Sequence, residues 1–230
     1  MGAVPTQALA WDIRCPPDVL ASEDIPGNDP WWFRHFFSAK RLNLLPDKSQ
    51  LRARFRSERD RFVEDLSDAD RLRAFSVAPS PLRKLFTPNI VVSAYQPTGS
   101  EADPMRLLAQ AAEAGCITAL PHVTSRAAPM QFLRWGHGDP LVPGPFGLMQ
   151  PDIDAERCKP DIVLVPLLAF TDGGVRLGQG AGHYDRALSL LDGSTAVGIA
   201  WSVQQAEILP HDPWDIPLDA ILTEKAWIEP

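Results

Sequence analysis

The sequence predicts an α/β protein, a three-layer α/β/α sandwich with a mostly parallel sheet. After residue 88, short β-rich runs alternate with helical stretches, as they do where crossover helices join parallel strands. One of these runs, residues 161–166 (DIVLVP), is almost continuously apolar, which is typical of a strand buried on both faces. Apolar residues make up 45 % of the chain and charged residues 22 %, so a core of ordinary composition can form.

The first element of this domain is expected to be a helix over residues 48–66. The apolar residues that fall on one narrow stripe at helical spacing are Leu51, Phe55, Phe62 and Leu66. Lys48 and Arg52 lie four residues apart and share a side of the first turns. The pattern leaves two interpretations of these two cations open, a solvated basic face or a pair that reaches an anionic ligand.

The remaining elements alternate as the fold class requires. A helix should begin at Asp103-Pro104, where Asp suits the N-cap and Pro the first helical position, and should end at Gly115. A strand over residues 116–120 should end at Pro121. The other strands are expected over residues 90–95, 130–135, 161–166, 196–201 and 219–223, and the other helices over residues 184–191 and 202–209.

Residues 1–45 are predicted to be an irregular N-terminal extension, and residues 46–230 a single α/β domain. Prolines and acidic residues are frequent in the first 30 positions. Five aromatic residues then fall within seven positions: Trp31, Trp32, Phe33, Phe36 and Phe37. Because so many aromatic side chains are unfavourable in water, we expect this group to dock on the body of the protein or on a second subunit.

Charge and composition argue against several kinds of partner. Lys and Arg number 22 and Asp and Glu 29, giving a net charge of −7, which disfavours general nucleic-acid binding. No apolar run approaches the ~20 residues of a membrane span, and the N-terminus lacks a signal-peptide pattern. The cysteines form no CxxC pair, which fits a reducing compartment. We expect a soluble cytoplasmic protein, a monomer or weak homodimer, with no nucleic-acid or membrane partner.

The most informative segment is residues 166–186 (PLLAFTDGGVRLGQGAGHYDR). Gly178, Gly180 and Gly182 stand at alternate positions just before a predicted helix, so the backbone can approach a ligand and its N–H groups can converge on an anion. Arg176 offers a permanently charged fork suited to phosphate. Asp185 follows at once, and a carboxylate beside a phosphate site suits a bridging Mg²⁺ ion.

Better-known glycine motifs are absent from this segment. It contains no GxxxxGK[ST] loop, and its GxGxG spacing, with no acidic residue about 20 positions on, is not a dinucleotide fingerprint. It also has no GxSxG nucleophile turn. A glycine-rich turn is often only structural, but the arginine, three glycines, helix start and acid together favour an anion site.

The segment RLGQGAGHYDR (residues 176–186) resembles the RLGxGxGxYDR signature of the 5-formyltetrahydrofolate cyclo-ligases, also called methenyltetrahydrofolate synthetases. Weaker motifs follow in that family's order, among them KxxLR at residues 48–52, YQP at 95–97 and WDIPLD at 214–219. The resemblance covers residues 46–227. It implies a scaffold of the isomerase and CoA-transferase type. It also implies an enzyme that uses ATP and Mg²⁺ to convert 5-formyltetrahydrofolate into 5,10-methenyltetrahydrofolate, ADP and phosphate.

The resemblance also implies roles for individual residues. ATP would bind at Lys48, Arg52, Arg176, Leu177, Gly178, Gln179, Gly180, Ala181, Gly182, His183 and Tyr184. The catalytic residues would be Lys48, Glu101 and Arg176, with Glu101 at the formyl and pterin end. The folate would contact Glu101, Met130, Phe132 and Tyr184. Asp185 and Asp215 would hold Mg²⁺, and Asp212 competes with Asp215 for the second place.

Other functions stay open alongside this one. A non-catalytic relative would bind folate or nucleotide without turnover. A sugar-phosphate enzyme on a similar scaffold would use the same glycine-rich loop without ATP. A nucleic-acid module built on the arginine-rich helix is the weakest alternative, because that helix has a better use at an ATP site.

Overall fold

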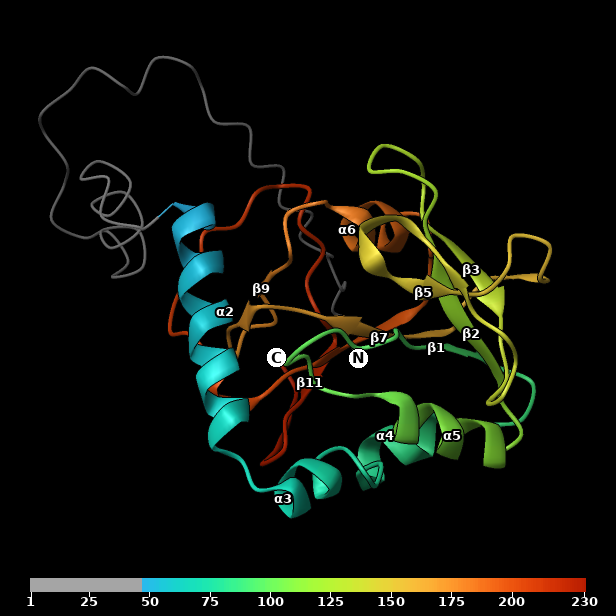
Figure 1. Ribbon diagram of the computed structural model, residues 1–230, viewed down its shortest axis with the longest axis horizontal. Helices are drawn as coiled ribbons and strands as arrows, with labels where there is room; N and C mark the ends of the chain where they lie inside the picture. Colours follow the sequence, from blue (N-terminus) through green and yellow to red (C-terminus); the bar gives the residue numbers. More distant parts are fainter. Residues whose placement is uncertain (1–46) are drawn as a thin grey trace, which may run out of the picture. The chain divides into compact units, whose positions relative to one another are not determined.

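One mixed sheet organises residues 47–230, the part of the chain that the computed structural model describes (Figure 1). Its strands, in spatial order, are β12 (Trp227–Ile228), β11 (Ala220–Leu222), β10 (Thr195–Ile199), β7 (Ile162–Pro166), β1 (Val91–Ser93), β2 (Ile117–His122), β3 (Gln131–Arg134) and β6 (Arg157–Cys158). The strands from β11 to β2 run parallel, and β12, β3 and β6 add antiparallel edges. The prediction of a mostly parallel sheet is confirmed.

Helices cover both faces of this sheet. The helices are α2 (Lys48–Asp65), α3 (Asp68–Arg73), α4 (Ser80–Leu85), α5 (Met105–Glu113) and α6 (His183–Leu188). In Figure 1, α3, α4 and α5 lie along one face, α6 lies on the other, and α2 stands at one end. The alternation along β7 matches this arrangement, because Ile162 and Leu164 share a core with Leu107 of α5, whereas Val163 and Val165 share one with Ala187 of α6.

Helix α2 forms where its sequence favours both the start and the buried face. Asp47 caps it, accepting a hydrogen bond from the Ser49 N–H at 3.1 Å. Leu51 and Phe55 are buried as predicted, whereas Phe62 and Leu66 are only partly buried against the core. The residues that do continue the buried stripe after Phe55 are Arg59 and Val63.

Several predicted element ends differ from the structure; the helix expected over residues 184–191, for example, ends at Leu188. Two further differences have a clear physical cause. Strand β2 does not end at Pro121 but continues to His122, because β3 pairs with it up to that residue. Proline is tolerated there because β1 pairs with β2 only as far as Ala119, so no ladder donor is needed on that side. The helix expected over residues 202–209 is only a 3₁₀ turn, η3 (Ser202–Gln204). Beyond it the chain is extended, and the Ala206 N–H donates to the carbonyl of Phe170 at 2.8 Å.

Short paired segments complete the part that carries the site. They are β8 (Ala169–Phe170) with β9 (Arg176–Leu177), and β4 (Val142–Pro143) with β5 (Met149–Gln150), with the 3₁₀ turn η2 (Pro145–Gly147) between the latter two. Within residues 47–230, the helices are too short or too polar to cross a membrane. The predicted extension and its aromatic group lie outside the described residues.

Candidate active site

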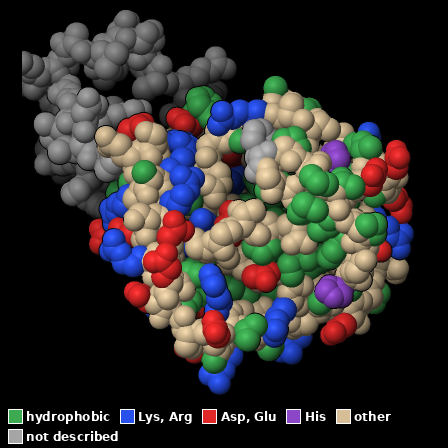
Figure 2. Space-filling model, viewed as in Figure 1, with side chains coloured by type: hydrophobic (Ala, Val, Ile, Leu, Met, Phe, Trp, Pro, Cys, Tyr) green, Lys and Arg blue, Asp and Glu red, His purple; other side chains and the backbone are tan. Residues whose placement is uncertain are grey.

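A cavity of about 710 Å³ lies at the carboxyl ends of the parallel strands. Tyr95, just after β1, and Pro166, at the end of β7, line its floor, which is where open α/β sheets place ligands. One wall comes from α2 and another from the loop before α6. In Figure 2, which has the view of Figure 1, Lys and Arg side chains gather over α2.

The loop before α6 is a glycine arc, defined here as residues 178–182. Gly180 and Gly182 have φ angles of +103° and +66°, conformations that favour glycine. A Cβ atom on Gly180 would also lie 3.3 Å from Cζ of Arg52. The glycines are therefore required both by backbone conformation and by the close approach of α2.

Arginines hold the glycine arc from two sides. The Nε atom of Arg52 donates to the Gly178 carbonyl at 2.9 Å, and Nη2 of Arg56 donates to Oε1 of Gln179 at 2.8 Å. From α6, Nη1 of Arg186 donates to the Ala181 carbonyl at 3.0 Å. All three bonds are accepted by oxygen atoms of the arc, so they orient the arc without using its amide N–H groups.

Arg176 and Asp185 form a buried ion pair behind the arc. Nη2 of Arg176 lies 2.5 Å from Oδ1 of Asp185, and the Arg176 side chain is only 3 % exposed. Burial lowers the pKa of Arg176 although Asp185 opposes the change, and a guanidinium stays charged at neutral pH in any case. The same Asp185 oxygen accepts the Ile216 N–H at 3.2 Å, which brings the segment carrying Asp215 next to α6.

A second group of charges, the outer cluster, consists of Lys48, Asp212 and Asp215. Nζ of Lys48 lies 2.7 Å from Oδ2 of Asp212 and 2.6 Å from Oδ2 of Asp215. Partial burial disfavours both charges, but the hydrogen bonds outweigh it, so the pKa of Lys48 is raised and that of Asp215 is lowered. Lys48 and Asp215 are therefore charged together at neutral pH.

The two predicted metal ligands, Asp185 and Asp215, lie on adjoining segments, and each uses one oxygen, Oδ1 and Oδ2 respectively, in the bonds above. Residues 47–230 contain no group of three or more His, Cys, Asp or Glu side chains that would enclose a metal. Mg²⁺ commonly binds through one or two carboxylates together with phosphate oxygens and water. Because they are only two carboxylates, Asp185 and Asp215 suit a Mg²⁺ ion that arrives with a nucleotide better than one that the protein holds permanently.

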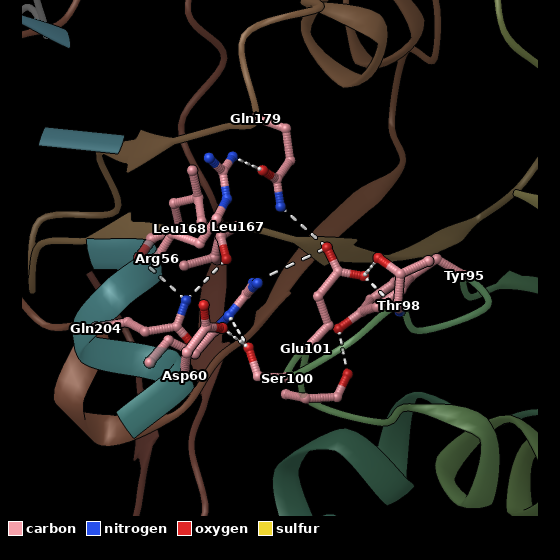
Figure 3. A network of polar contacts seen from close by, with 12 residues as sticks. Arg56, Asp60, Tyr95, Thr98, Ser100, Glu101, Leu167, Leu168, Gln179 and Gln204 are labelled. Carbon is pink, nitrogen blue, oxygen red and sulfur yellow. Dashed lines mark hydrogen bonds and ion pairs between the residues drawn. The ribbon is translucent and has the colours of Figure 1, made fainter. Parts of the chain in front are cut away.

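Glu101 connects the glycine arc to the opposite wall of the cavity (Figure 3). Its Oε2 accepts hydrogen bonds from the backbone N–H of Thr98 at 2.9 Å and from the Thr98 hydroxyl at 3.1 Å. Its Oε1 accepts from Nε2 of Gln179 at 3.0 Å. One hydrogen bond therefore joins the acid predicted at the formyl end to the loop predicted at the phosphate end.

The structure does not bring every predicted residue to this cavity. Four predicted site residues are connected to the lining of the cavity by hydrogen bonds or the chain but lie outside it: Lys48, Arg52, Gly180 and Asp215. Met130 and Tyr184 line it, but Phe132 is 5 % exposed and packs in the core beneath α6, facing a separate cavity of about 190 Å³. The prediction that Phe132 forms a folate wall is not supported, because β3 turns this side chain toward α6. The side chain of Leu177 is likewise buried, so only its backbone is available to a ligand.

Sequence reasoning missed the arginines that α2 sends into the cavity. Arg56 and Arg59 line it, and Arg59 is buried although its side chain is charged. A signal for Arg59 was present, because it lies four residues after Phe55 and eight after Leu51 on the buried stripe. A cation on an otherwise apolar helical stripe departs from the pattern, and a buried cation needs a partner inside the protein.

Comparison with known proteins identifies the family of the chain. The family model of the 5-formyltetrahydrofolate cyclo-ligase family matches residues 45–224. The chain belongs to the 5-formyltetrahydrofolate cyclo-ligase family. The resemblance found in the glycine-rich segment is thereby confirmed for most of the chain.

Individual members of the cyclo-ligase family align over different lengths. A 5-formyltetrahydrofolate cyclo-ligase of Mycolicibacterium smegmatis is 36 % identical over 79 % of this chain and 95 % of its own length. The Haemophilus influenzae cyclo-ligase is 39 % identical, but over 40 % of this chain and about half (52 %) of its own length. The solution structure of Aquifex aeolicus 5,10-methenyltetrahydrofolate synthetase is 32 % identical, covers 79 % of this chain and 92 % of its own, and superposes with a TM-score of 0.63.

Proposed function

We propose that this protein converts 5-formyltetrahydrofolate into 5,10-methenyltetrahydrofolate, at the expense of ATP, which leaves as ADP and phosphate. The observation that carries the proposal is the hydrogen bond between Gln179 and Glu101, inside a cavity lined by both. It supports a site in which a phosphoryl donor and a formyl acceptor meet. Membership of the cyclo-ligase family supplies the substrate class.

The chemistry asks for positioning more than for acid–base catalysis. The formyl oxygen attacks the γ-phosphorus of ATP, the bond to ADP breaks, and an N5-iminium phosphate results. N10 then attacks the formyl carbon, phosphate leaves with the former formyl oxygen and takes up the proton lost from N10, and the methenyl bridge closes. Phosphorylation is needed because an amide oxygen is a poor leaving group, and the charge of the transferring group must be neutralised.

We assign the phosphate end to the glycine arc and the cations around it. Backbone N–H groups of residues 178–184 would receive phosphate oxygens, with Arg176 beside them and with Lys48 and Arg52 supplying charge from α2. Mg²⁺, when bound, would neutralise phosphate charge, held by Asp185 and Asp215. Because Lys48 bonds Asp215 at 2.6 Å, ion binding would require Lys48 to turn toward the nucleotide.

We assign the folate end to Glu101, Met130 and Tyr184. Glu101 is held by Thr98 and Gln179, so its carboxylate is oriented before substrate arrives and would stabilise the cationic iminium. Met130 is buried at the cavity wall and Tyr184 is half-buried there, so both would cover the flat pterin ring. The finer parts of the proposal are a cytoplasmic location, a monomer or weak homodimer, and a single domain over residues 46–230 preceded by an extension.

A direct assay tests the proposal. The purified chain, given 5-formyltetrahydrofolate and MgATP, should produce the absorbance of the methenyl product, and omission of ATP should abolish it. Lys48→Ala, Arg176→Ala and Asp185→Ala should each abolish product formation, while Asp192→Ala, an exposed change beyond α6, should not. Thermal stabilisation by both ligands without product would favour a non-catalytic binding protein. Turnover of a sugar phosphate without ATP hydrolysis would contradict the proposal.

A further inference from the structure

Arg59 is the most deeply buried cation of α2, and a hydrogen bond fixes its guanidinium at Nε. The residue is 5 % exposed. Its Nε donates to the Ser100 hydroxyl oxygen at 2.8 Å, and that hydroxyl donates in turn to Oδ1 of Asp60. The Ser100 carbonyl accepts the indole N–H of Trp201 at 3.0 Å. These contacts fix the plane of the Arg59 guanidinium relative to the cavity.

One end of the same guanidinium has no hydrogen-bond acceptor. Among residues 47–230, Nη1 of Arg59 is buried and makes no hydrogen bond. The acid nearest to it in the described ion pairs is Glu101, whose Oε1 lies 3.9 Å away, beyond hydrogen-bond distance. Buried donors without an acceptor are rare and costly, and they concentrate where a ligand or a reacting group completes the set.

The position of Nη1 identifies which part of the site it serves. Arg59 lines the cavity, and the same Glu101 oxygen that it approaches also accepts the hydrogen bond from Gln179 of the glycine arc. Arg59 therefore lies at the junction of the two ends assigned above. If the proposed function is right, this is where the γ-phosphoryl group passes to the formyl oxygen, and the following inference rests on that function.

We propose that Arg59 is a catalytic residue whose Nη1 donates a hydrogen bond to the phosphoryl group during its transfer. In the transition state, charge spreads over the three equatorial oxygens, and a fixed guanidinium in a dry site stabilises it without reorganisation. The bond from phosphorus to ADP breaks and the bond to the formyl oxygen forms. Arg59 keeps its proton throughout, because a guanidinium does not titrate near neutral pH.

The neighbouring arginine has a different part. Arg56 is exposed and bonds the Gln179 side chain at 2.8 Å, so it orients the glycine arc and acts through it. Arg59, by contrast, has in Nη1 a buried donor that makes no hydrogen bond and that faces Glu101 only across 3.9 Å. The alternative to our proposal is that Arg59 only supports Ser100 and Glu101 structurally.

The steady-state kinetics of Arg59 variants separate a catalytic role from a structural one. The variants are Arg59→Met and Arg59→Lys, and the control is Arg61→Met, an exposed arginine of the same helix. We expect Arg59→Met to lower kcat about 10²–10³-fold with less than about a threefold change in the KM for ATP. Arg59→Lys keeps the charge but not the planar fork, so its kcat should fall between those of wild type and Arg59→Met. Arg61→Met should match wild type.

Binding measurements add a readout that a structural role would not move. Wild type should bind MgADP with fluoroaluminate, a mimic of the transferring phosphoryl group, more tightly than MgADP alone. Arg59→Met should lose this preference while keeping its affinity for MgADP and its melting temperature. Parallel losses of MgADP affinity and melting temperature, or an unchanged preference, would overturn the proposal.

The same measurement distinguishes this inference from the proposed function. A wild-type chain that makes no methenyl product would defeat the proposed function, yet the fluoroaluminate comparison needs no folate turnover and would still decide on Arg59. A wild-type chain that makes product, together with an Arg59→Met variant that makes it equally fast, would defeat only the inference.

Discussion

The two groups of charges near the glycine arc, the inner pair (Arg176 and Asp185) and the outer cluster, differ in how deeply their cations are buried. In the inner pair, the side chains of Arg176 and Asp185 are 3 % and 21 % exposed. In the outer cluster, those of Lys48, Asp212 and Asp215 are 24 %, 42 % and 18 % exposed. Breaking a buried pair strands a charge in the protein, whereas water compensates an exposed one. The buried Arg176 therefore depends on Asp185 for its stability, whereas Lys48 and Asp212, which water reaches, are free to rearrange around a ligand.

The largest expected effect comes from breaking the inner pair. Asp185→Asn leaves the buried Arg176 guanidinium without its anion and should lower the free energy of unfolding by about 3 kcal/mol. Urea denaturation followed by circular dichroism measures this loss. The matched change Asp192→Asn, at an exposed position, should stay within about 0.5 kcal/mol of wild type. Equal stabilities of the two variants would remove the distinction between inner and outer charges.

The sequence was sufficient to predict the elements that carry this comparison. The apolar run of β7, the start of α2 and the spacing of Gly178, Gly180 and Gly182 are each local signals, and each predicted its element. In these segments, the structure that the local sequence favours is the same as the one that tertiary packing requires. The family of the chain could be identified from the glycine-rich segment for the same reason.

The remainder depended on contacts between distant parts of the chain. Strand β2 continues through Pro121 because β3 pairs with it there, and residues after Gln204 are extended because Phe170 offers a carbonyl. The partners of Arg59 come from residues 41 and 42 positions further along the chain, Ser100 and Glu101. No spacing within α2 could have indicated them.

An intermediate effect should come from a change in the glycine arc itself. Gly180 and Gly138 have nearly the same φ, +103° and +99°, so alanine at either position should cost about 1–3 kcal/mol of stability. A Cβ on Gly138 meets nothing within 4 Å, whereas one on Gly180 meets Arg52. Only Gly180→Ala should therefore displace Arg52 and weaken ATP binding, by about tenfold.

Isothermal titration with ATP and Mg²⁺ measures that difference, and Gly138→Ala is the control for backbone strain. Because the two variants should lose similar stability, a loss of affinity restricted to Gly180→Ala would show that the contact with α2 matters for the nucleotide. Equal affinities would mean that the arc tolerates movement, and the assignment of phosphate binding to it would fail.

The smallest expected effect lies in the outer cluster and decides between its two aspartates. Asp215 is 18 % exposed, precedes the Ile216 N–H that bonds Asp185, and has a lowered pKa, so its carboxylate is ionised and close to the other predicted ligand. Asp215→Asn should raise the Mg²⁺ concentration for half-maximal methenyl formation at least about tenfold.

Asp212→Asn should change that Mg²⁺ requirement less than about twofold, because its exposed carboxylate contributes only a weak ion pair to Lys48. Both substitutions remove one negative charge next to Lys48. A general electrostatic effect would therefore shift the Mg²⁺ concentration for half-maximal methenyl formation equally in the two variants. A larger shift for Asp212→Asn would exchange the roles of the two aspartates. It would also mean that the more exposed end of the outer cluster, and not the end joined to the inner pair, meets the ion.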